Sequence, residues 1–467
     1  MFYKLKRDYM LRGWKLLPTG VINRKTREFK FLPGKKFAVL KMCTGLLDSE
    51  SVLFDDEQRK IIEELRAEGY VEANETPSPL EDGQDYKFYD NRLMRSAHWS
   101  ITGKCNCKCR HCYMSAPQHK VEELTHEQCL NIIAQMANCG VQDVHLTGGE
   151  ALVRKDFWEL VDALTAADIV ISMIYSNGIL INEKFCDDLR RRNLRPSFQI
   201  SFDGVGGCHD WLRGVEGAER FALRAIKILR EKNFPVTCAL SVHKGNKHIL
   251  RETVKTLASA GANYLRVVPV SESGDAFGMS DKILSTAEMY DLLLDYIPQY
   301  IEDGAPMPLS LMGTFEGINT TEYKIPLAKL PENLNIDKLC VCANVRNSFH
   351  IDFNGFVMPC PSMGNDDDGK KHFSLIFDKP LKELLNEGAY MNFINTRMSD
   401  YFKANPKCAA CKYKNRCCGG CRGIAMENNG DGDLLGVDKA TCLFFKGGYY
   451  DKVIALGEKL NLKRIVA

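Results

Sequence analysis

The sequence predicts an α/β fold: a partial (β/α)6 TIM-like barrel, preceded by a winged-helix-like domain and followed by a cysteine-rich domain. Three observations lead to this prediction. Short β-rich runs alternate with helical stretches from about residue 96, strands and short helices mix before residue 75, and the texture changes to short strands, glycine and cysteine from Cys340. Alternation of strands and helices is typical of a parallel sheet.

The first element is a small unit over residues 1–75. Strand-like runs in residues 3–32 are broken by the turn signal PTG at 18–20. Residues 34–45 and 55–69 have apolar residues at helical spacing and end in glycine, and residues 70–74 suggest a closing strand. The polar, proline-containing residues 76–95 are expected to be a linker.

The second element is the barrel, expected over residues 96–305. Six β-rich runs end in glycine or polar residues by about residue 270, with helical stretches between them. Six units are too few for a closed eight-fold barrel, so the barrel is expected to be incomplete. Barrel enzymes build active sites at the carboxyl ends of their strands, where these polar motifs lie.

The last elements are a bridging region over 306–339 and the cysteine-rich domain over 340–467. Two strand-like runs surround Asn354-Gly355, which predicts a hairpin with a type I′ turn. A helix is expected to close the chain over residues 450–466.

The composition restricts the class of protein. No signal peptide opens the chain and no stretch approaches the length of a membrane span, so a cytoplasmic protein without a membrane partner is expected. In that compartment the nineteen cysteines are expected to be metal ligands and buried thiols instead of disulfides. The net charge of +2 argues against a nucleic-acid partner, although residues 1–40 hold eleven Lys or Arg against two acidic residues.

Four cysteines lie within the stretch CNCKCRHC at residues 105–112. Cys105, Cys109 and Cys112 have the spacing C-x3-C-x2-C, and Cys107 is additional. Three thiolates can hold a [4Fe–4S] cluster with one iron open to another ligand. A zinc site with His111 or Cys107 as the fourth ligand also fits this stretch alone. The stretch by itself leaves both chemistries open.

The motifs that follow decide between them. The cysteine spacing, together with TGGE at 147–150, YSNG at 175–178 and ISFDG at 200–204, resembles the radical S-adenosylmethionine (SAM) enzymes. The resemblance implies that the three spaced cysteines hold a [4Fe–4S] cluster whose fourth iron is chelated by SAM. It also implies electron transfer that cleaves SAM to methionine and a 5′-deoxyadenosyl radical, which abstracts a hydrogen atom. Cys107 is then a spare thiol, and His111 replaces the family's usual aromatic residue.

The same resemblance implies which residues contact SAM. Gly148, Gly149 and Glu150 are expected at its amino group, because glycine lets backbone carbonyls approach an ammonium and Glu150 supplies charge. Ser176 and Asn177 are expected to line the ribose side.

Further SAM contacts are expected at the next strand end. Ser201 and Asp203 are expected near the ribose and the carboxylate. Either Arg213 or Arg224 is expected to pair with the SAM carboxylate, and the sequence does not separate the two.

The cysteines from residue 340 onward resemble the seven-cysteine SPASM extension of radical SAM enzymes, which carries two auxiliary [4Fe–4S] clusters. A zinc ribbon is the alternative, but attachment to a radical SAM core favours iron and sulfur. The resemblance assigns the nearer cluster to Cys342, Cys360 and Cys421, and the farther cluster to Cys408, Cys411, Cys417 and Cys442. Two fully ligated cubanes need eight thiolates, so Cys340 is predicted as the eighth ligand; Cys418 is spare.

The resemblance implies a peptide maturase with SAM and three [4Fe–4S] clusters as cofactors. The expected partners are a precursor peptide, whose leader binds the N-terminal domain, and a flavodoxin- or ferredoxin-type electron donor. The expected product is a thioether or carbon–carbon cross-link, with epimerisation as an alternative. A formylglycine-forming sulfatase-type maturase is less favoured because Pro361, not Asp, follows Cys360. An iron–sulfur DNA-binding sensor is the least favoured, and no catalytic base or hydrogen donor is assigned.

Overall fold

The computed structural model describes residues 1–116, 123–327, 334–342, 344–363, 372–429 and 433–465. The chain divides into two compact units by its internal contacts. The first comprises Met1–Met94 with Gln135–Gln142, and the second comprises Arg95–Ala134 with Asp143–Ala467.

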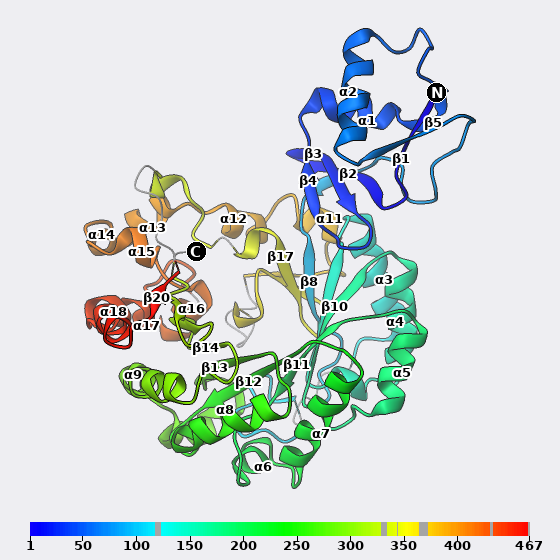
Figure 1. Cartoon of the computed structure of the whole chain (residues 1–467). Coiled ribbons are helices and arrows are strands. Elements are labelled where there is room, and N and C mark those ends of the chain that lie inside the picture. The colour runs from blue at the N-terminus through cyan, green and yellow to red at the C-terminus, as the bar shows by residue number, and fades with distance from the viewer. Residues whose placement is uncertain (117–122, 328–333, 343, 364–371, 430–432, 466–467) are drawn as a thin grey trace. The chain divides into compact units, whose positions relative to one another are not determined.

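Residues 1–94 of the first unit form two small sheets and the helices α1 and α2 (Figure 1). One sheet has the order β5-β1-β6, and the other has the order β4-β3-β2-β7. The elements are β1 (Phe2–Leu5), β2 (Tyr9–Lys15), β3 (Leu17–Asn23), β4 (Phe29–Phe31), α1 (Gly34–Met42), β5 (Thr44–Asp48), α2 (Asp56–Ala67), β6 (Val71–Asn74) and β7 (Lys87–Arg92). The two helices and the closing strand lie where the sequence predicts them.

Helix α2 shows how local sequence sets these elements. The Asp55 side chain accepts a hydrogen bond from the backbone N–H of Gln58, whose side chain accepts one from the backbone of Asp55. Ile62 and Leu65 are buried on its inner face. The segment expected to be a linker contains a strand, because β7 pairs in parallel with β2 and buries Tyr89 and Asn91.

The second unit is organised by one sheet with thirteen strands in the order β19-β18-β17-β8-β9-β10-β11-β12-β13-β14-β15-β16-β20. Six consecutive parallel strands form its centre: β8 (Ser96–Ser100), β9 (Asp143–Thr147), β10 (Val170–Ser176), β11 (Ser197–Ser201), β12 (Val236–Val242) and β13 (Tyr264–Pro269). The helices between them are α3 (His126–Asn138), α4 (Phe157–Ala166), α5 (Glu183–Arg191), α6 (Cys208–Arg213), α7 (Ala218–Glu231) and α8 (Leu250–Ser259). The predicted α/β partial barrel is confirmed.

The sheet continues beyond the six strands on both sides. After α9 (Thr286–Glu302), β14 (Leu309–Leu311) adds a parallel strand beside β13, and β15 (Phe315–Gly317) and β16 (Glu322–Lys324) follow antiparallel. The other edge is extended by β17 (Ser348–Ile351), which pairs in parallel with β8, and then by β18 (Phe356–Met358) and β19 (Ser374–Leu375).

The turn between β17 and β18 differs from the prediction. A type I′ turn needs positive φ at both central residues, whereas Gly355 has φ 92° and Asn354 is not in the left-handed region. The Asp352 carboxylate explains the change, since it accepts hydrogen bonds from the backbone N–H groups of Asn354 at 2.8 Å and Phe356 at 2.9 Å.

The barrel strands have one apolar and one polar face. In β12, Val236, Cys238, Leu240 and Val242 are buried, and the intervening residues are half-buried. The alternate positions along the six strands include His98, His145, Tyr175, Gln199 and Arg266, which share the face opposite the fully buried residues. A polar interior is unusual for a barrel whose lumen is only a packed core, so this lumen is suited to a ligand.

The C-terminal part of the second unit consists mainly of short helices (Figure 1). They are α11 (Leu381–Leu384), α12 (Ala389–Asn395), α13 (Met398–Ala404), α14 (Pro406–Ala409), α15 (Lys414–Cys417), α16 (Arg422–Asn429), α17 (Lys439–Lys446) and α18 (Tyr449–Lys459), before β20 (Lys463–Arg464). The closing helix is present as α18. Among the described residues, no helix has the length and apolar character to cross a bilayer.

Candidate active site

A cavity of about 800 Å³ opens at the carboxyl ends of the barrel strands. Three parts of the second unit line it: the cysteine loop after β8, the polar ends of the strands, and residues of the C-terminal region. The predicted residues on its lining are Cys105, Cys109, Cys112, Gly148, Gly149, Glu150, Ser176, Asn177, Ser201, Arg213, Cys342, Cys360 and Cys421. The structure therefore brings most of the predicted SAM contacts and six predicted cluster ligands to one space.

The cysteine loop presents four thiols to this cavity. Cys107, predicted as spare, is buried between Cys105 and Cys109 and forms sulfur hydrogen bonds with both, which raises its own pKa. The hydrogen bond from Cys107, and then the charge of Arg213, lower the pKa of Cys109 to about 6 in spite of burial. Burial raises the pKa of Cys112 to about 11. The loop favours the thiolate form at Cys109, as a metal ligand requires.

The two glycines of the Gly-Gly-Glu motif hold the cysteine loop. The backbone N–H of Gly149 donates to the carbonyl of Thr102 at 2.9 Å, and that of Glu150 donates to the carbonyl of Lys104 at 2.8 Å. An added Cβ would lie 2.4 Å from the Thr102 oxygen at Gly148 and 2.3 Å from the Lys104 oxygen at Gly149. Glycine is thus required here for close approach of two backbone segments.

Glu150 is held by the end of β10. Its carboxylate accepts hydrogen bonds from the backbone N–H of Asn177 at 2.7 Å and from the Ser176 hydroxyl at 3.1 Å. Burial raises the pKa of Glu150 to about 7 even though these hydrogen bonds favour the ionised form. An ammonium group at this carboxylate would relieve the cost of its buried charge.

Asp203 and Arg213 form a buried ion pair beside the cysteine loop. The Arg213 Nε lies 2.7 Å from the Asp203 Oδ2, and its Nη1 lies 3.7 Å from the Cys109 sulfur. Burial opposes ionisation of Asp203, but the charge of Arg213 and a hydrogen bond from His209 hold its pKa well below its usual value. Arg224 instead donates to the Ile179 carbonyl at 3.2 Å and does not line the cavity. The geometry favours Arg213 over Arg224 for a carboxylate near Cys109.

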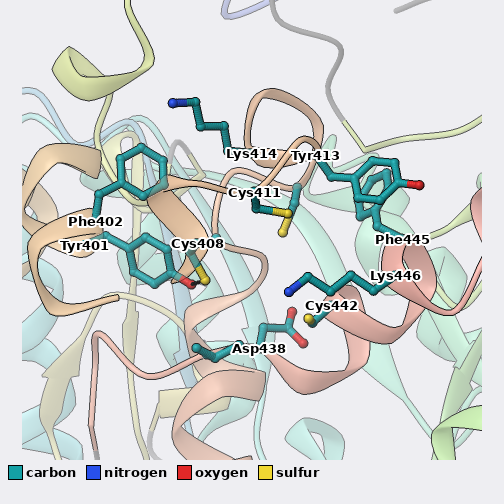
Figure 2. A pocket seen from close by; sticks show the side chains of 13 residues that line it. Tyr401, Phe402, Cys408, Cys411, Tyr413, Lys414, Asp438, Cys442, Phe445 and Lys446 are labelled. Atoms are coloured by element: carbon teal, nitrogen blue, oxygen red, sulfur yellow. Dashed lines mark hydrogen bonds between the residues drawn. The ribbon is translucent and has the colours of Figure 1, made fainter. Parts of the chain in front are cut away.

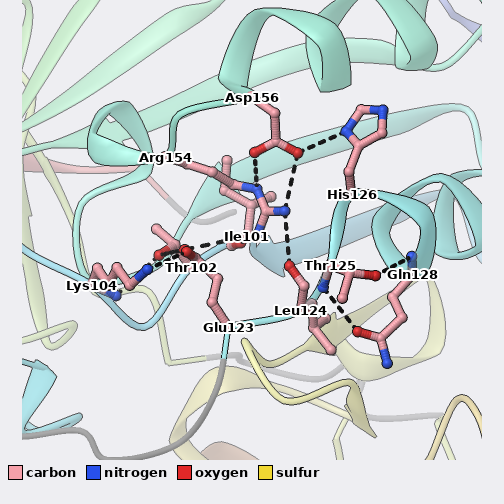
Figure 3. Close-up of polar contacts among 10 residues, drawn as sticks. All are labelled: Ile101, Thr102, Lys104, Glu123, Leu124, Thr125, His126, Gln128, Arg154 and Asp156. Carbon is pink, nitrogen blue, oxygen red and sulfur yellow. Dashed lines mark hydrogen bonds and ion pairs between the residues drawn. The ribbon is translucent and has the colours of Figure 1, made fainter.

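A second polar network fixes the base of the cysteine loop, and the sequence analysis missed it (Figure 3). Arg154 donates to the carbonyls of Ile101 at 2.8 Å and Leu124 at 3.0 Å, and its Nε lies 2.8 Å from the Asp156 carboxylate. Lys104 pairs with Glu123 at 2.6 Å. Arg154 thus joins the strand end before the loop to the segment after Gly-Gly-Glu. The signal in the sequence that could have indicated this network was Arg154, four residues after Glu150, followed two residues later by Asp156.

The nearer auxiliary cysteines face the same cavity. Cys342, Cys360 and Cys421 line it. Burial, and then the neighbouring Cys421 and Cys342, raises the pKa of Cys360 to about 12. Burial also raises the pKa of Cys421, with a smaller contribution from Cys342. Cys340, predicted as their fourth ligand, is not on this lining. Its sulfur accepts hydrogen bonds from Arg346 and, at 3.4 Å, from Arg397. Its role as a ligand stays a prediction.

The farther auxiliary cysteines form a separate site. Cys408, Cys411, Cys417 and Cys442 line a small cavity of about 40 Å³. Figure 2 shows the aromatic side chains around it, among them Tyr401, whose hydroxyl donates to the Cys408 sulfur at 3.5 Å. Cys418 does not line this cavity, and its assignment as a spare thiol stays a prediction.

Three groups of thiols are candidates for iron–sulfur clusters. None of the nineteen cysteines is in a disulfide, and no group of three His, Cys, Asp or Glu side chains among the described residues is arranged to hold one ion. Ligands of a cubane bind different irons and therefore stand farther apart than ligands of one ion. The three groups of thiols have the composition that such clusters need.

Comparisons with known families agree with this geometry. Residues 99–259 match the radical SAM superfamily, and residues 340–412 match SPASM, an iron–sulfur cluster-binding domain. The chain is 35% identical over 178 residues to the sporulation killing factor maturation protein SkfB of Bacillus subtilis, a match that covers 38% of this chain and 43% of that protein. It is 25% identical to the AdoMet-dependent heme synthase of Nitratidesulfovibrio vulgaris, over 76% of this chain and 92% of that protein.

A solved structure supports the fold. Streptococcus suis SuiB, bound to its precursor peptide SuiA, superposes with a TM-score of 0.63 at 16% identity and covers 94% of this chain and 99% of SuiB. At this identity the likeness concerns the fold.

Proposed function

Because the chain contains a radical SAM domain and a SPASM domain, we propose that it is a peptide maturase that uses SAM and three [4Fe–4S] clusters. The observation that carries this proposal is the cavity of about 800 Å³, onto which both the Cys105–Cys112 loop and the triad Cys342, Cys360 and Cys421 face. A space of this size has room for SAM together with a side chain of a larger substrate.

The chain's own residues have distinct tasks in this proposal. Cys105, Cys109 and Cys112 hold the cluster that SAM chelates. Glu150 binds the SAM ammonium, and Arg213, oriented by Asp203, binds its carboxylate; these three lie around the same thiols.

Ser176, Asn177 and Ser201 contribute hydroxyl and amide groups on the ribose side. When cluster and SAM are bound, reductive cleavage of SAM supplies a 5′-deoxyadenosyl radical that removes one hydrogen atom from the peptide. Closing a thioether or carbon–carbon bond would then release a second hydrogen as a proton and an electron, and the thiols of the two auxiliary sites would hold the clusters that accept that electron.

Peptide substrates are supported by two relatives. SkfB is named as a maturation protein, and SuiB was solved with a precursor peptide. The first unit offers sheet edges at β4 and β7, and an extended leader peptide can add a strand to such an edge. We propose that this unit, residues 1–75 extended by the strand β7, binds the leader, and that a flavodoxin- or ferredoxin-type protein supplies electrons.

Two alternatives remain within the same chemistry. Epimerisation needs a thiol hydrogen donor, and no residue of the site is assigned to that role. A formylglycine-forming maturase needs a base beside the nearer triad, but Pro361 follows Cys360. Among the described lining residues the carboxylate is that of Glu150, which belongs to the Gly-Gly-Glu motif at the cysteine loop.

The test is anaerobic co-expression of the chain with each short reading frame beside its gene, followed by mass spectrometry of the peptides. A cross-link lowers the mass by two hydrogens per bond, and epimerisation is seen by chiral analysis at unchanged mass. The control is the Cys109→Ala variant, which should leave every peptide unmodified. The proposal fails if the wild-type chain cleaves SAM but alters none of the peptides.

A further inference from the structure

Arg266 lines the large cavity at the carboxyl ends of the barrel strands. It is on β13, where it pairs in register with Ala239 of β12 and Ser310 of β14. Its neighbours Leu265 and Val267 are buried on the other face of the strand, while Arg266 itself is exposed and lines the large cavity. The exposed side chain of Arg266 therefore faces the open space of the cavity.

The guanidinium of Arg266 has no hydrogen bond or ion pair with any residue that the structure describes. The nearby carboxylate of Glu316, on β15, accepts a hydrogen bond from the Tyr264 hydroxyl at 2.8 Å. The other arginines on the cavity lining are occupied: Arg213 pairs with Asp203, and Arg422 donates to the Gly436 carbonyl at 2.8 Å. Among the residues that the structure describes, Arg266 is therefore the cavity-lining arginine without a hydrogen-bond or ion-pair partner.

Two neutral donors accompany this cation. His98 and Tyr175 line the same cavity, and their ring centroids are 6.1 Å apart. Burial, then the neighbouring His145, His350 and Arg266, lowers the pKa of His98 to about 3. His98 is thus a neutral imidazole that can donate one hydrogen bond, as the Tyr175 hydroxyl can. Tyr175 and Arg266 line the same cavity.

A planar guanidinium with free donors matches a carboxylate, which it can bind through two parallel hydrogen bonds. SAM does not account for this site, because Arg213 already stands 3.7 Å from the Cys109 sulfur, where the SAM carboxylate is expected. We propose that Arg266 binds a carboxylate of the substrate in the lumen, with His98 and Tyr175 as further donors on the same cavity lining. This inference rests on the proposed function and deepens it: the peptide presents an acidic side chain or a free C-terminus near the reacting carbon.

The test measures binding of defined probes to the SAM-loaded holoenzyme under anaerobic conditions. The probes are an acetylated, amidated alanine octapeptide with one central glutamate, its glutamine twin, the glutamine peptide with a free C-terminal carboxylate, and glutarate. The variants are Arg266→Met and, as a matched control, Arg220→Met, which removes an exposed arginine on the outer helix α7.

The wild type and Arg220→Met should bind an acidic probe about tenfold to a hundredfold more tightly than the neutral peptide, and Arg266→Met should lose that preference. Preference for the glutamate peptide assigns a side-chain carboxylate, and preference for the free-acid peptide assigns a C-terminus. SAM affinity and uncoupled 5′-deoxyadenosine formation should be unchanged in Arg266→Met.

Three results overturn the inference: no preference in the wild type, a preference that persists in Arg266→Met, or loss of SAM binding in that variant. Tight binding of glutarate, lost in Arg266→Met, without binding of any peptide would support the carboxylate site and count against the peptide substrate. The inference and the proposed function can therefore fail separately.

Discussion

The two cavities of the second unit differ in the thiols they present. The large cavity has two groups of three predicted ligands, Cys105, Cys109 and Cys112 on one loop and Cys342, Cys360 and Cys421 from the C-terminal region. The small cavity has one group of four, surrounded by Tyr401, Phe402, Tyr413 and Phe445.

The difference suggests that the two cavities have different roles. A cubane held by three thiolates keeps a position for a ligand that is not a cysteine, and the large cavity has the space and the charged groups to bring one there. Four thiolates complete a cubane, and a cavity of about 40 Å³ lined by aromatic rings leaves no room for a substrate. We therefore expect the chemistry in the large cavity and an electron-transfer or structural role for the small one.

The largest expected effect comes from breaking the cysteine loop. Cys109→Ala should reduce 5′-deoxyadenosine formation from SAM and dithionite to the level without enzyme, because the cluster that SAM chelates loses a ligand. Cys107→Ala, which removes the spare thiol of the same loop, should retain activity. The iron content of Cys109→Ala should fall from about twelve to about eight irons per chain, because the auxiliary clusters are retained. Equal activity of both variants would show that the loop ligands were assigned wrongly.

Removing a ligand from the small cavity should give a different pattern. Cys417→Ala should lose about four irons, whereas Cys418→Ala should keep about twelve. Because this site stands apart from the SAM contacts, uncoupled SAM cleavage should persist in Cys417→Ala while peptide modification falls. Loss of SAM cleavage together with the iron would contradict the division of roles between the two cavities.

A moderate effect is expected from pH on SAM binding in the large cavity. The pKa of Glu150 is raised to about 7 by burial, so the carboxylate is ionised above that pH and protonated below it. Only the ionised form attracts the SAM ammonium, so affinity should fall about tenfold per pH unit below 7. Anaerobic calorimetry between pH 6 and pH 8 measures this, and Glu150→Gln should bind weakly at both values. A flat profile in the wild type would exclude Glu150 as the ammonium partner.

The smallest effect is expected from substituting Cys340. This substitution tests whether the nearer auxiliary cluster has three or four protein ligands. If Cys340 is the fourth ligand, the Cys340→Ser variant should show a shifted electron paramagnetic resonance spectrum of the nearer cluster. Little iron should be lost, because three thiolates still hold that cluster. A spectrum identical to that of the wild type would mean that this cluster keeps an open position, with Cys340 held instead by Arg346 and Arg397.

Spacing and strand position made much of the site predictable. The polar ends of the six β-rich runs predicted the barrel. The cysteine spacing grouped Cys417 with Cys408 and set Cys418 aside, and Cys417 and Cys408 line the small cavity together. These features depend on neighbours along the chain or on a fixed repeat. The position of Glu150 at the end of its strand was predictable for the same reason.

The remaining features depend on contacts between distant segments. Arg154 looked like any charged residue until the fold placed three segments around it, and the sequence could not choose between Arg213 and Arg224 because both are near the same strand end. The type I′ turn was overruled by the Asp352 side chain. That Arg266 meets no partner among the described residues is a property of its surroundings, which no local pattern records.

The pairing of β17 with β8 has a consequence for the timing of synthesis. Ser348 pairs with Ser96, so the first barrel strand waits for a partner that the ribosome makes some 250 residues later. At usual translation rates that interval is on the order of 10 to 50 seconds. During this interval, the β8 edge of the nascent sheet has no partner strand. The thiols of the Cys105–Cys112 loop, which follows β8, are then accessible both to the cell's iron–sulfur delivery proteins and to its oxidants.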